Sequence, residues 1–214
     1  MRVLFLGNSF TYFHALPVMA HHLTGWETDA VTRGGAYLHD FLNPGDEMYA
    51  QAEAALKNGR WDYVVLQEQS FNAIGNQADF LMSCKKLCEK IRAVGAVPVF
   101  YASWAYREGS EKLNNTGVSY GSMAKGLEDA YAKAARENEG RMANVGAAFT
   151  ACREAYEVYE ADDYHPSVYG SYLAACMICR AIEPAASLAP WTPEGMALSH
   201  GLALQNKAEG EYTC

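Results

Sequence analysis

The sequence has 214 residues, of which 50% are hydrophobic and 20% are charged, and its formal net charge is −8. This length and composition are typical of one globular domain with a single sizeable core, and the acidic balance argues against binding to nucleic acid or to an anionic membrane surface. No apolar run reaches the roughly 20 residues of a membrane-spanning helix, and the first residues do not have the pattern of a signal peptide, so a cytoplasmic location is expected.

Short apolar runs alternate with longer helical stretches, which is typical of βαβ units around a parallel sheet. The predicted strands, in chain order, are residues 3–6, 28–32, 62–67, 97–102 and 141–147. The predicted helices are residues 12–23, 46–58, 77–94, 119–138, 149–160 and 167–182. We therefore expect an α/β fold, a three-layer α/β/α sandwich with a mainly parallel five-stranded sheet. Residues 1–183 form the expected main domain, and residues 184–214 form a tail that packs on it or is partly mobile.

Six cysteines occur along the chain, two of them in a Cys-x-x-Cys pair within an apolar helical stretch: Cys84, Cys88, Cys152, Cys176, Cys179 and Cys214. Without an export signal, they are best interpreted as reduced and mostly buried thiols. No metal site is expected from them. The sequence also lacks a phosphate-binding Gly-x-x-x-x-Gly-Lys-Ser/Thr loop and a dinucleotide fingerprint, so no cofactor is expected.

Ser9 lies in the segment Gly-Asn-Ser-Phe-Thr (residues 7–11), between the first predicted strand and a helix. A turn of this kind can present a serine hydroxyl beside the free N–H groups of a helix N-terminus, where an oxyanion can be stabilised. On local evidence alone, a serine before a helix is more often just an N-cap. The Gly-x-Ser-x-Gly elbow of α/β-hydrolases is absent.

Asp162 and His165 lie between two predicted helices, and Pro166 favours an extended backbone at His165. A carboxylate three residues before a histidine can orient the imidazole so that its other nitrogen faces a nucleophile. Asp163 is a competing candidate for the carboxylate, and a helix-capping turn is the alternative interpretation. Among the other histidines, His39 is the one that could line a pocket.

Together these segments resemble the SGNH (GDSL-like) hydrolase superfamily, over about residues 3–182. Residues 7–11 stand where the first block of that superfamily carries its nucleophile, and residues 34–38 (Gly-Gly-Ala-Tyr-Leu) stand where the second block supplies a glycine N–H. The resemblance implies a flavodoxin-like SGNH hydrolase fold for residues 1–183. It also implies that Ser9 is the nucleophile, that His165 is the base oriented by Asp162, and that Gly35 contributes to the oxyanion hole.

More narrowly, the chain resembles an uncharacterised bacterial branch of SGNH-type proteins with Gly-Asn-Ser-Phe-Thr, Leu-Gln-Glu-Gln-Ser and Trp-Ala-Tyr segments. Residues 66–72 depart from the superfamily's third block, Gly-x-Asn-Asp, whose asparagine completes the oxyanion hole. Gln69 or Gln67, or else Asn72, could donate a side-chain amide instead. The alternative is that the glutamines bind loop backbone.

The resemblance implies a serine esterase that acts on short-chain acyl esters, acetyl above all, on a small molecule or a carbohydrate. Trp104 and Phe71, with Tyr106 and Tyr164, lie in predicted loops and could stack on sugar rings, although such side chains often serve only packing. Two alternatives stay open. One is a non-catalytic ligand-binding protein with an altered oxyanion hole, and the other is an acyltransferase that uses the same three residues.

Overall fold

The computed structural model describes residues 1–185 and 187–210. Its centre is a parallel sheet with the strand order β2-β1-β3-β4-β5. The strands are β1 (Arg2–Gly7), β2 (Glu27–Thr32), β3 (Tyr63–Leu66), β4 (Val97–Ala102) and β5 (Arg141–Asn144). The helices are α1 (Ser9–Tyr12), η1 (Phe13–Ala15), α2 (Leu16–Thr24), η2 (Leu38–Leu42), α3 (Glu47–Asn58), α4 (Asn72–Gly75), α5 (Gln77–Ala93), α6 (Glu111–Asn114), α7 (Tyr120–Glu137), α8 (Val145–Cys152), α9 (Val168–Ile182) and α10 (Leu198–Glu209). The predicted α/β fold is confirmed, and the sheet is wholly parallel.

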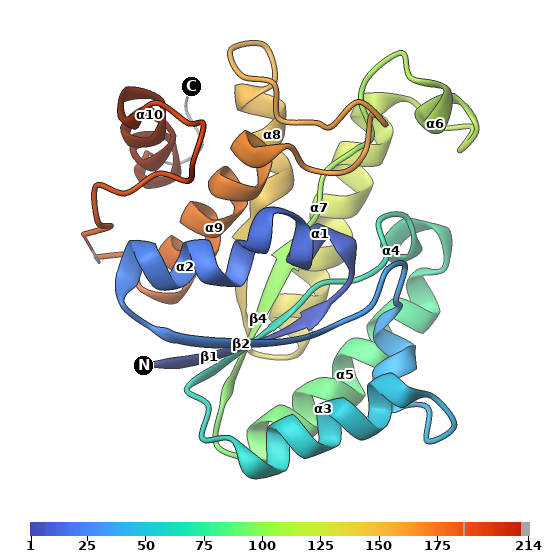
Figure 1. The fold of residues 1–214 in the computed structure, drawn as a ribbon. Helices are drawn as coiled ribbons and strands as arrows, with labels where there is room; N and C mark the ends of the chain where they lie inside the picture. The colour runs from blue at the N-terminus through green and yellow to red at the C-terminus, as the bar shows by residue number, and fades with distance from the viewer. Residues whose placement is uncertain (186, 211–214) are drawn as a thin grey trace.

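Two apolar cores lie on opposite faces of this sheet, because successive side chains of a strand point to opposite sides. Val3 and Phe5 of β1 belong to the core that α2 and α9 cover, whereas Leu4 and Leu6 belong to the core beneath α3, α5 and α7. Figure 1 shows α2 and α9 on one side of the sheet and α3 and α5 on the other. Burial on both faces explains why the three inner strands, β1, β3 and β4, are largely continuous apolar runs.

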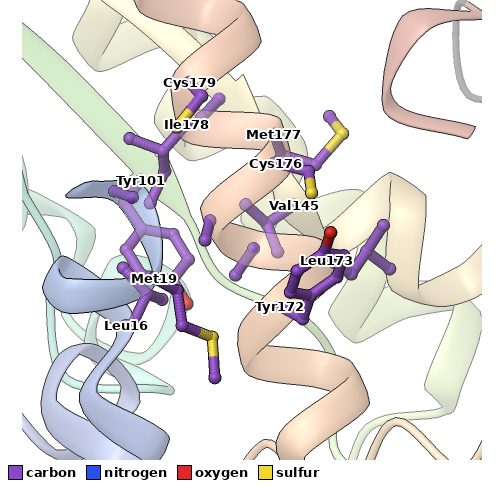
Figure 2. Packing of buried hydrophobic residues seen from close by; sticks show 14 of the residues in the cluster. Leu16, Met19, Tyr101, Val145, Tyr172, Leu173, Cys176, Met177, Ile178 and Cys179 are labelled. Atoms are coloured by element: carbon purple, nitrogen blue, oxygen red, sulfur yellow. The ribbon is translucent and has the colours of Figure 1, made fainter. Parts of the chain in front are cut away.

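Helix α9 is the central element of the first core, and Figure 2 shows its side chains among those of α2 and β4. Cys176 and Cys179 lie on this helix and have no exposed surface. Burial raises the pKa of both thiols well above the usual value, which disfavours the reactive thiolate. The five cysteines that the structure describes are buried, as expected; Cys214 lies outside the described residues.

The helix predicted at residues 12–23 is broken in two, which corrects that prediction. A 3-10 turn separates α1 from α2, and both His14 (φ 51°) and Ala15 (φ 54°) have left-handed backbone conformations. Pro17 lies in the first turn of α2. Because a proline has no N–H to donate and restricts the residue before it, one continuous helix cannot pass through this point.

Two further boundaries differ from the prediction near residue 145. The fifth strand ends at Asn144, whose side chain accepts a hydrogen bond from the backbone N–H of Ala147 and so caps α8. The expected helix at residues 149–160 therefore begins earlier and ends at Cys152. Residues 153–167 form an extended loop instead, held by a bridge between Tyr159 and Pro166.

The predicted tail contains a helix that the sequence pattern did not reveal. Helix α10 packs on α9, with Leu204 fully buried and Gln205 donating hydrogen bonds to the hydroxyl of Tyr172 and the carbonyl of Ala189. Residues 211–214 of the predicted tail lie outside the described residues, and the domain boundary at residue 183 stays a prediction. Across residues 1–185 and 187–210, no helix combines the length and apolarity that crossing a bilayer requires.

The strand order determines where a site can form. Strand β1 lies between β2 and β3, so the chain leaves β1 toward one edge of the sheet and later returns to its other side. Ligand sites of open parallel sheets lie beyond the carboxyl ends of the strands at such a switch point. The segments that follow β1, β2 and β3 are residues 8–12, 33–37 and 67–72, which include the three segments singled out near Ser9, Gly35 and Gln69.

Candidate active site

Ser9 occupies the first turn of α1, directly beyond the carboxyl end of β1. Asn8 is the N-cap, and its side-chain oxygen accepts a hydrogen bond from the backbone N–H of Phe10 at 3.1 Å. The turn is so tight that a Cβ on Gly7 would lie 2.4 Å from Oγ1 of Thr11. The N-cap is thus Asn8, and the side chain of Ser9 is left for another use.

Gln67, which directly follows β3, holds this turn. It does not line the cavity of about 390 Å³ that opens over Ser9, which corrects its expected place in an oxyanion hole. Its side-chain oxygen accepts hydrogen bonds from the backbone N–H of Asn8 (2.9 Å) and from Oγ1 of Thr11 (3.0 Å). Its amide group donates to the carbonyl of Glu68, and the whole side chain is buried. For Gln67, the alternative of loop-backbone hydrogen bonding is therefore the one observed.

Ser9, His165 and Asp162 form a continuous hydrogen-bonded series. Nε2 of His165 lies 2.8 Å from Oγ of Ser9, and Nδ1 lies 2.6 Å from Oδ2 of Asp162. The other oxygen of Asp162 accepts hydrogen bonds from the backbone N–H groups of Tyr164 (3.3 Å) and His165 (3.0 Å). A carboxylate that accepts from Nδ1–H leaves Nε2 free to accept the serine proton.

The environment of Asp162 favours its ionised form. Partial burial raises the pKa of this carboxyl. The hydrogen bonds from the side chain and backbone of His165 and from the backbone of Tyr164 lower the pKa by more than burial raises it, so the net pKa lies below the usual value. Asp163 has a left-handed backbone (φ 67°) and pairs with Arg107 at 2.8 Å. The geometry thus places Asp162, and not Asp163, beside the imidazole.

The ring of His165 is held from several sides. Phe13 stacks on it with a centroid distance of 4.2 Å and an interplanar angle of 1°. The backbone carbonyl of His165 accepts a hydrogen bond from the backbone N–H of Glu160 at 2.8 Å. Trp104 donates its indole N–H to the carbonyl of Tyr164 at 3.0 Å. Contacts of this kind restrict the imidazole to the orientation in which it meets Ser9.

Two backbone N–H groups of residues that line the cavity over Ser9 are available for a developing negative charge. In the part of the chain that the structure describes, the N–H groups of Ser9 and Gly35 donate to no protein acceptor. Gly35 has φ 69°, a conformation in which glycine is strongly favoured. The Asn8 amide donates to the carbonyl of Ala36 at 3.0 Å and so joins this segment to the serine turn.

A third donor can come from Gln69, which lines the same cavity. Its side-chain oxygen accepts hydrogen bonds from the backbone N–H groups of Phe71 and Asn72, at 2.9 and 3.1 Å. Its amide nitrogen has only a long contact to Oγ of Ser70, 3.3 Å. Asn72 instead donates to Asp79 at 3.0 Å. Of the three amide side chains considered from the sequence, Gln69 is the one that faces the cavity.

Glu68 lies beneath these donors and joins the segments that carry them. Its Oε1 accepts hydrogen bonds from the backbone N–H of Gln69 (2.6 Å) and of Leu38 (3.1 Å), and the side chain has no exposed surface. Burial raises the pKa of this carboxyl, and these two backbone hydrogen bonds lower it only partly, so the pKa reaches about 7. This carboxyl was not identified from the sequence.

We expect Glu68→Gln to change how stability depends on pH. The folded pKa of about 7 exceeds the unfolded value of 4.5, so the folded state holds the proton more tightly. The resulting stabilisation is complete below the unfolded pKa and is lost as pH rises through the folded pKa. The free energy of unfolding of wild type, relative to the variant, should fall by up to about 3 kcal/mol between about pH 4 and pH 8.

Denaturant unfolding at several pH values measures this difference. The control is Glu53→Gln, which removes an exposed carboxylate that pairs with Lys90 at 2.7 Å on the outer surface. Its stability difference from wild type should change little over the same range. A Glu68→Gln difference that is equally independent of pH contradicts the prediction.

A cavity of about 390 Å³ opens over Oγ of Ser9. Its lining combines backbone donors, aromatic rings and one lysine: Asn8, Ser9, Phe10, Tyr12, Phe13, Gly34, Gly35, Gln69, Ser70, Lys112, Tyr164 and His165. Trp104 is fully buried and stacks between Phe10 and Phe149. The expectation that Trp104 contacts substrate is therefore wrong, because its ring supports the cavity from behind. Phe71 packs partly buried against the second core and does not line the cavity either.

Sequence analysis missed Tyr12, Phe13 and Lys112 as lining residues. Tyr12 and Phe13 directly follow the Gly-Asn-Ser-Phe-Thr segment, a position that could have drawn attention to them. Lys112 lies on α6, within the long segment between β4 and α7, where no motif distinguishes it from other surface lysines. Tyr164 was among the aromatic candidates and does line the cavity. His39 pairs with Asp79 at 2.8 Å and stacks on Tyr37, away from the cavity.

Comparisons with known proteins place the fold. A protein from Slackia heliotrinireducens described as an SGNH hydrolase has 38% sequence identity and a TM-score of 0.81, over 85% of this chain and 98% of that one. A DUF4886 family protein from Bacteroides uniformis has 22% identity and a TM-score of 0.73, over 98% and 93% of the two chains. An acetylxylan esterase from Geobacillus stearothermophilus has 13% identity and a TM-score of 0.62, over 85% and 94%. No protein-family model and no curated protein sequence matches the chain.

Proposed function

This chain belongs to the SGNH hydrolases, and from that premise we propose that it is a serine esterase that removes short acyl groups, acetyl above all, from hydroxyl groups. The observation that supports the proposal most directly is the series Ser9–His165–Asp162, with contacts of 2.8 and 2.6 Å at the floor of an open cavity. A nucleophile, a base and an orienting carboxylate in this order are what acyl transfer to a serine requires.

In the first half of the reaction, Nε2 of His165 accepts the proton of Ser9 while Oγ attacks the ester carbonyl carbon. The carbonyl oxygen becomes an oxyanion and is met by the backbone N–H groups of Ser9 and Gly35 and by the side-chain amide of Gln69. The bond from carbon to the alcohol oxygen then breaks, and the alcohol leaves with the proton from His165. Asp162 stabilises the imidazolium throughout, and the acyl group remains on Oγ.

In the second half, water takes the place of the alcohol. His165 accepts a proton from the water molecule, the hydroxide attacks the acyl carbon, and the same donors hold the second oxyanion. The bond from the acyl carbon to Oγ of Ser9 then breaks, Oγ takes the proton from His165, and the carboxylic acid leaves. An acyl acceptor other than water would make the protein an acyltransferase, so analysis of the products with and without a sugar acceptor decides between the two activities.

The cavity supports a small acyl group and a ring-shaped alcohol. Its volume of about 390 Å³ lies near the lower end of the range for small-molecule sites. The rings of Tyr12, Phe13 and Tyr164 form part of its wall, and aromatic faces of this kind can stack on sugars. An acetylated carbohydrate is therefore our first choice of substrate. The cytoplasmic location of the protein stays a prediction from the sequence.

Turnover of p-nitrophenyl acetate, combined with labelling by a fluorophosphonate, tests the proposal. We expect p-nitrophenol and acetate in equal amounts, and a single phosphonyl group on the peptide that contains Ser9, with activity lost in proportion to labelling. Mass spectrometry locates the label. A folded protein that neither turns over the ester nor reacts with the phosphonate would instead support the non-catalytic binding protein.

A further inference from the structure

The cavity over Ser9 carries one unbalanced charge. Among the residues that the structure describes, Lys112 is the only lining residue with a permanent charge, and no aspartate or glutamate lines the cavity. The protein as a whole is acidic, with a formal net charge of −8. A lone ammonium group at the mouth of a site in an acidic protein makes that site locally more favourable to anions than the surrounding surface.

Lys112 is held by aromatic rings and not by a carboxylate. Its Nζ lies 4.2 Å from the ring centroid of Tyr164 and 5.5 Å from that of Tyr106, and among the described residues no acidic group lies within ion-pair distance of it. Neighbouring cations differ: Arg107 pairs with Asp163 and Arg153 pairs with Glu108, each at 2.8 Å. Cation–π contacts position the ammonium but leave its charge available to a ligand.

The position of Lys112 indicates which part of an ester it would meet. The ring of Tyr164 lies 4.1 Å from the ring of His165, and Lys112 lies over that same tyrosine ring. In the proposed mechanism, Nε2 of His165 gives its proton to the departing alcohol, whereas Gly35 and Gln69 hold the carbonyl oxygen. Lys112 therefore lies in the part of the cavity beside Tyr164 and His165. Since the proposed acyl group is small, an anionic group of the substrate that meets Lys112 belongs to the alcohol.

We propose that the substrates are acyl esters of alcohols that carry an anionic group, such as an acylated sugar acid, and that Lys112 binds this group. The inference rests on the proposed esterase function and names its substrate class. The anion can be a carboxylate, phosphate or sulfate, since an ammonium acts on each as a point charge. Because Lys112 is exposed, one such contact is expected to change the selectivity about 2- to 5-fold.

Three matched phenyl acetates test this substrate class: 4-acetoxybenzoate, 4-acetoxybenzenesulfonate and the neutral 4-acetoxybenzamide. The quantity measured is the ratio of kcat/KM for each anion to kcat/KM for the amide, which removes effects common to all three esters. We expect Lys112→Gln to lower both ratios about 2- to 5-fold and Lys112→Arg to keep them near the wild-type value. Raising the salt concentration should lower the wild-type ratios toward those of Lys112→Gln.

Lys125→Gln is the matched control, because Lys125 is an exposed lysine of α7 that pairs with Asp129 at 2.6 Å outside the cavity. It makes the same change in net charge and should leave the ratios at the wild-type value. If the ratios are equal in wild type, Lys112→Gln and Lys125→Gln while hydrolysis still depends on Ser9, the role of Lys112 is overturned and the proposed esterase function is retained. If wild type hydrolyses none of the three esters, the esterase function and this inference are both overturned.

Discussion

Ser9→Ala is expected to lower kcat for p-nitrophenyl acetate by about 10⁴- to 10⁶-fold. The variant loses the oxygen that becomes acylated, and water cannot take its place in a cavity arranged around Oγ. The fold should be retained, because the cap of α1 is the side chain of Asn8. The N–H groups of Ser9 and Gly35 also remain, so a small residual rate over the uncatalysed reaction is expected.

Initial rates of p-nitrophenol release, together with the melting temperature, measure this effect. Ser70→Ala is the matched control, since Ser70 also lines the cavity but contacts the hydroxyl of Tyr106 at 2.6 Å. It should lower kcat by no more than about tenfold, the size expected for an indirect loss of one hydrogen bond. A large loss in Ser70→Ala, with normal turnover in Ser9→Ala, would show that the nucleophile is assigned to the wrong serine.

Asp162→Asn is expected to lower kcat by about 10⁴-fold with little change in stability. The asparagine oxygen can still accept from the backbone N–H groups of Tyr164 and His165, as Oδ1 does now. Its NH₂ group would then face Nδ1 of His165, where Oδ2 accepts at present. Nδ1 would have to accept a hydrogen bond, the proton would move to Nε2, and the imidazole could no longer accept the proton of Ser9.

Asp163→Asn is the control for Asp162→Asn, because it changes the adjacent carboxylate in the same way. Asn tolerates the left-handed backbone at this position (φ 67°), and only the exposed ion pair with Arg107 is lost. Its kcat should remain within about threefold of wild type. Steady-state kinetics of both variants at several pH values decide the assignment. Equal losses in the two variants would contradict the role of Asp162.

The residues of the candidate site were predictable to different degrees. Ser9, Gly35, Asp162 and His165 lie in short motifs beside strand ends or in a turn, and the structure brings these three segments together. The amide side chains of residues 67–72 could not be sorted in this way, because β3 ends at Leu66 and the regular alternation of side chains does not extend into the segment that follows. There Gln67 points toward the serine turn, while Gln69 faces the cavity.

The sequence by itself determined the α/β class, the five strands and the places where chemistry could occur, because alternating apolar runs and turn residues depend on local physics. Only the tertiary structure decided which side chains meet. The break at Pro17 brings Phe13 onto His165, burial against α9 makes residues 198–209 a helix, and the rings of Tyr106 and Tyr164 hold Lys112 at the cavity. Most of these contacts join residues far apart in the chain, so no local pattern encodes them.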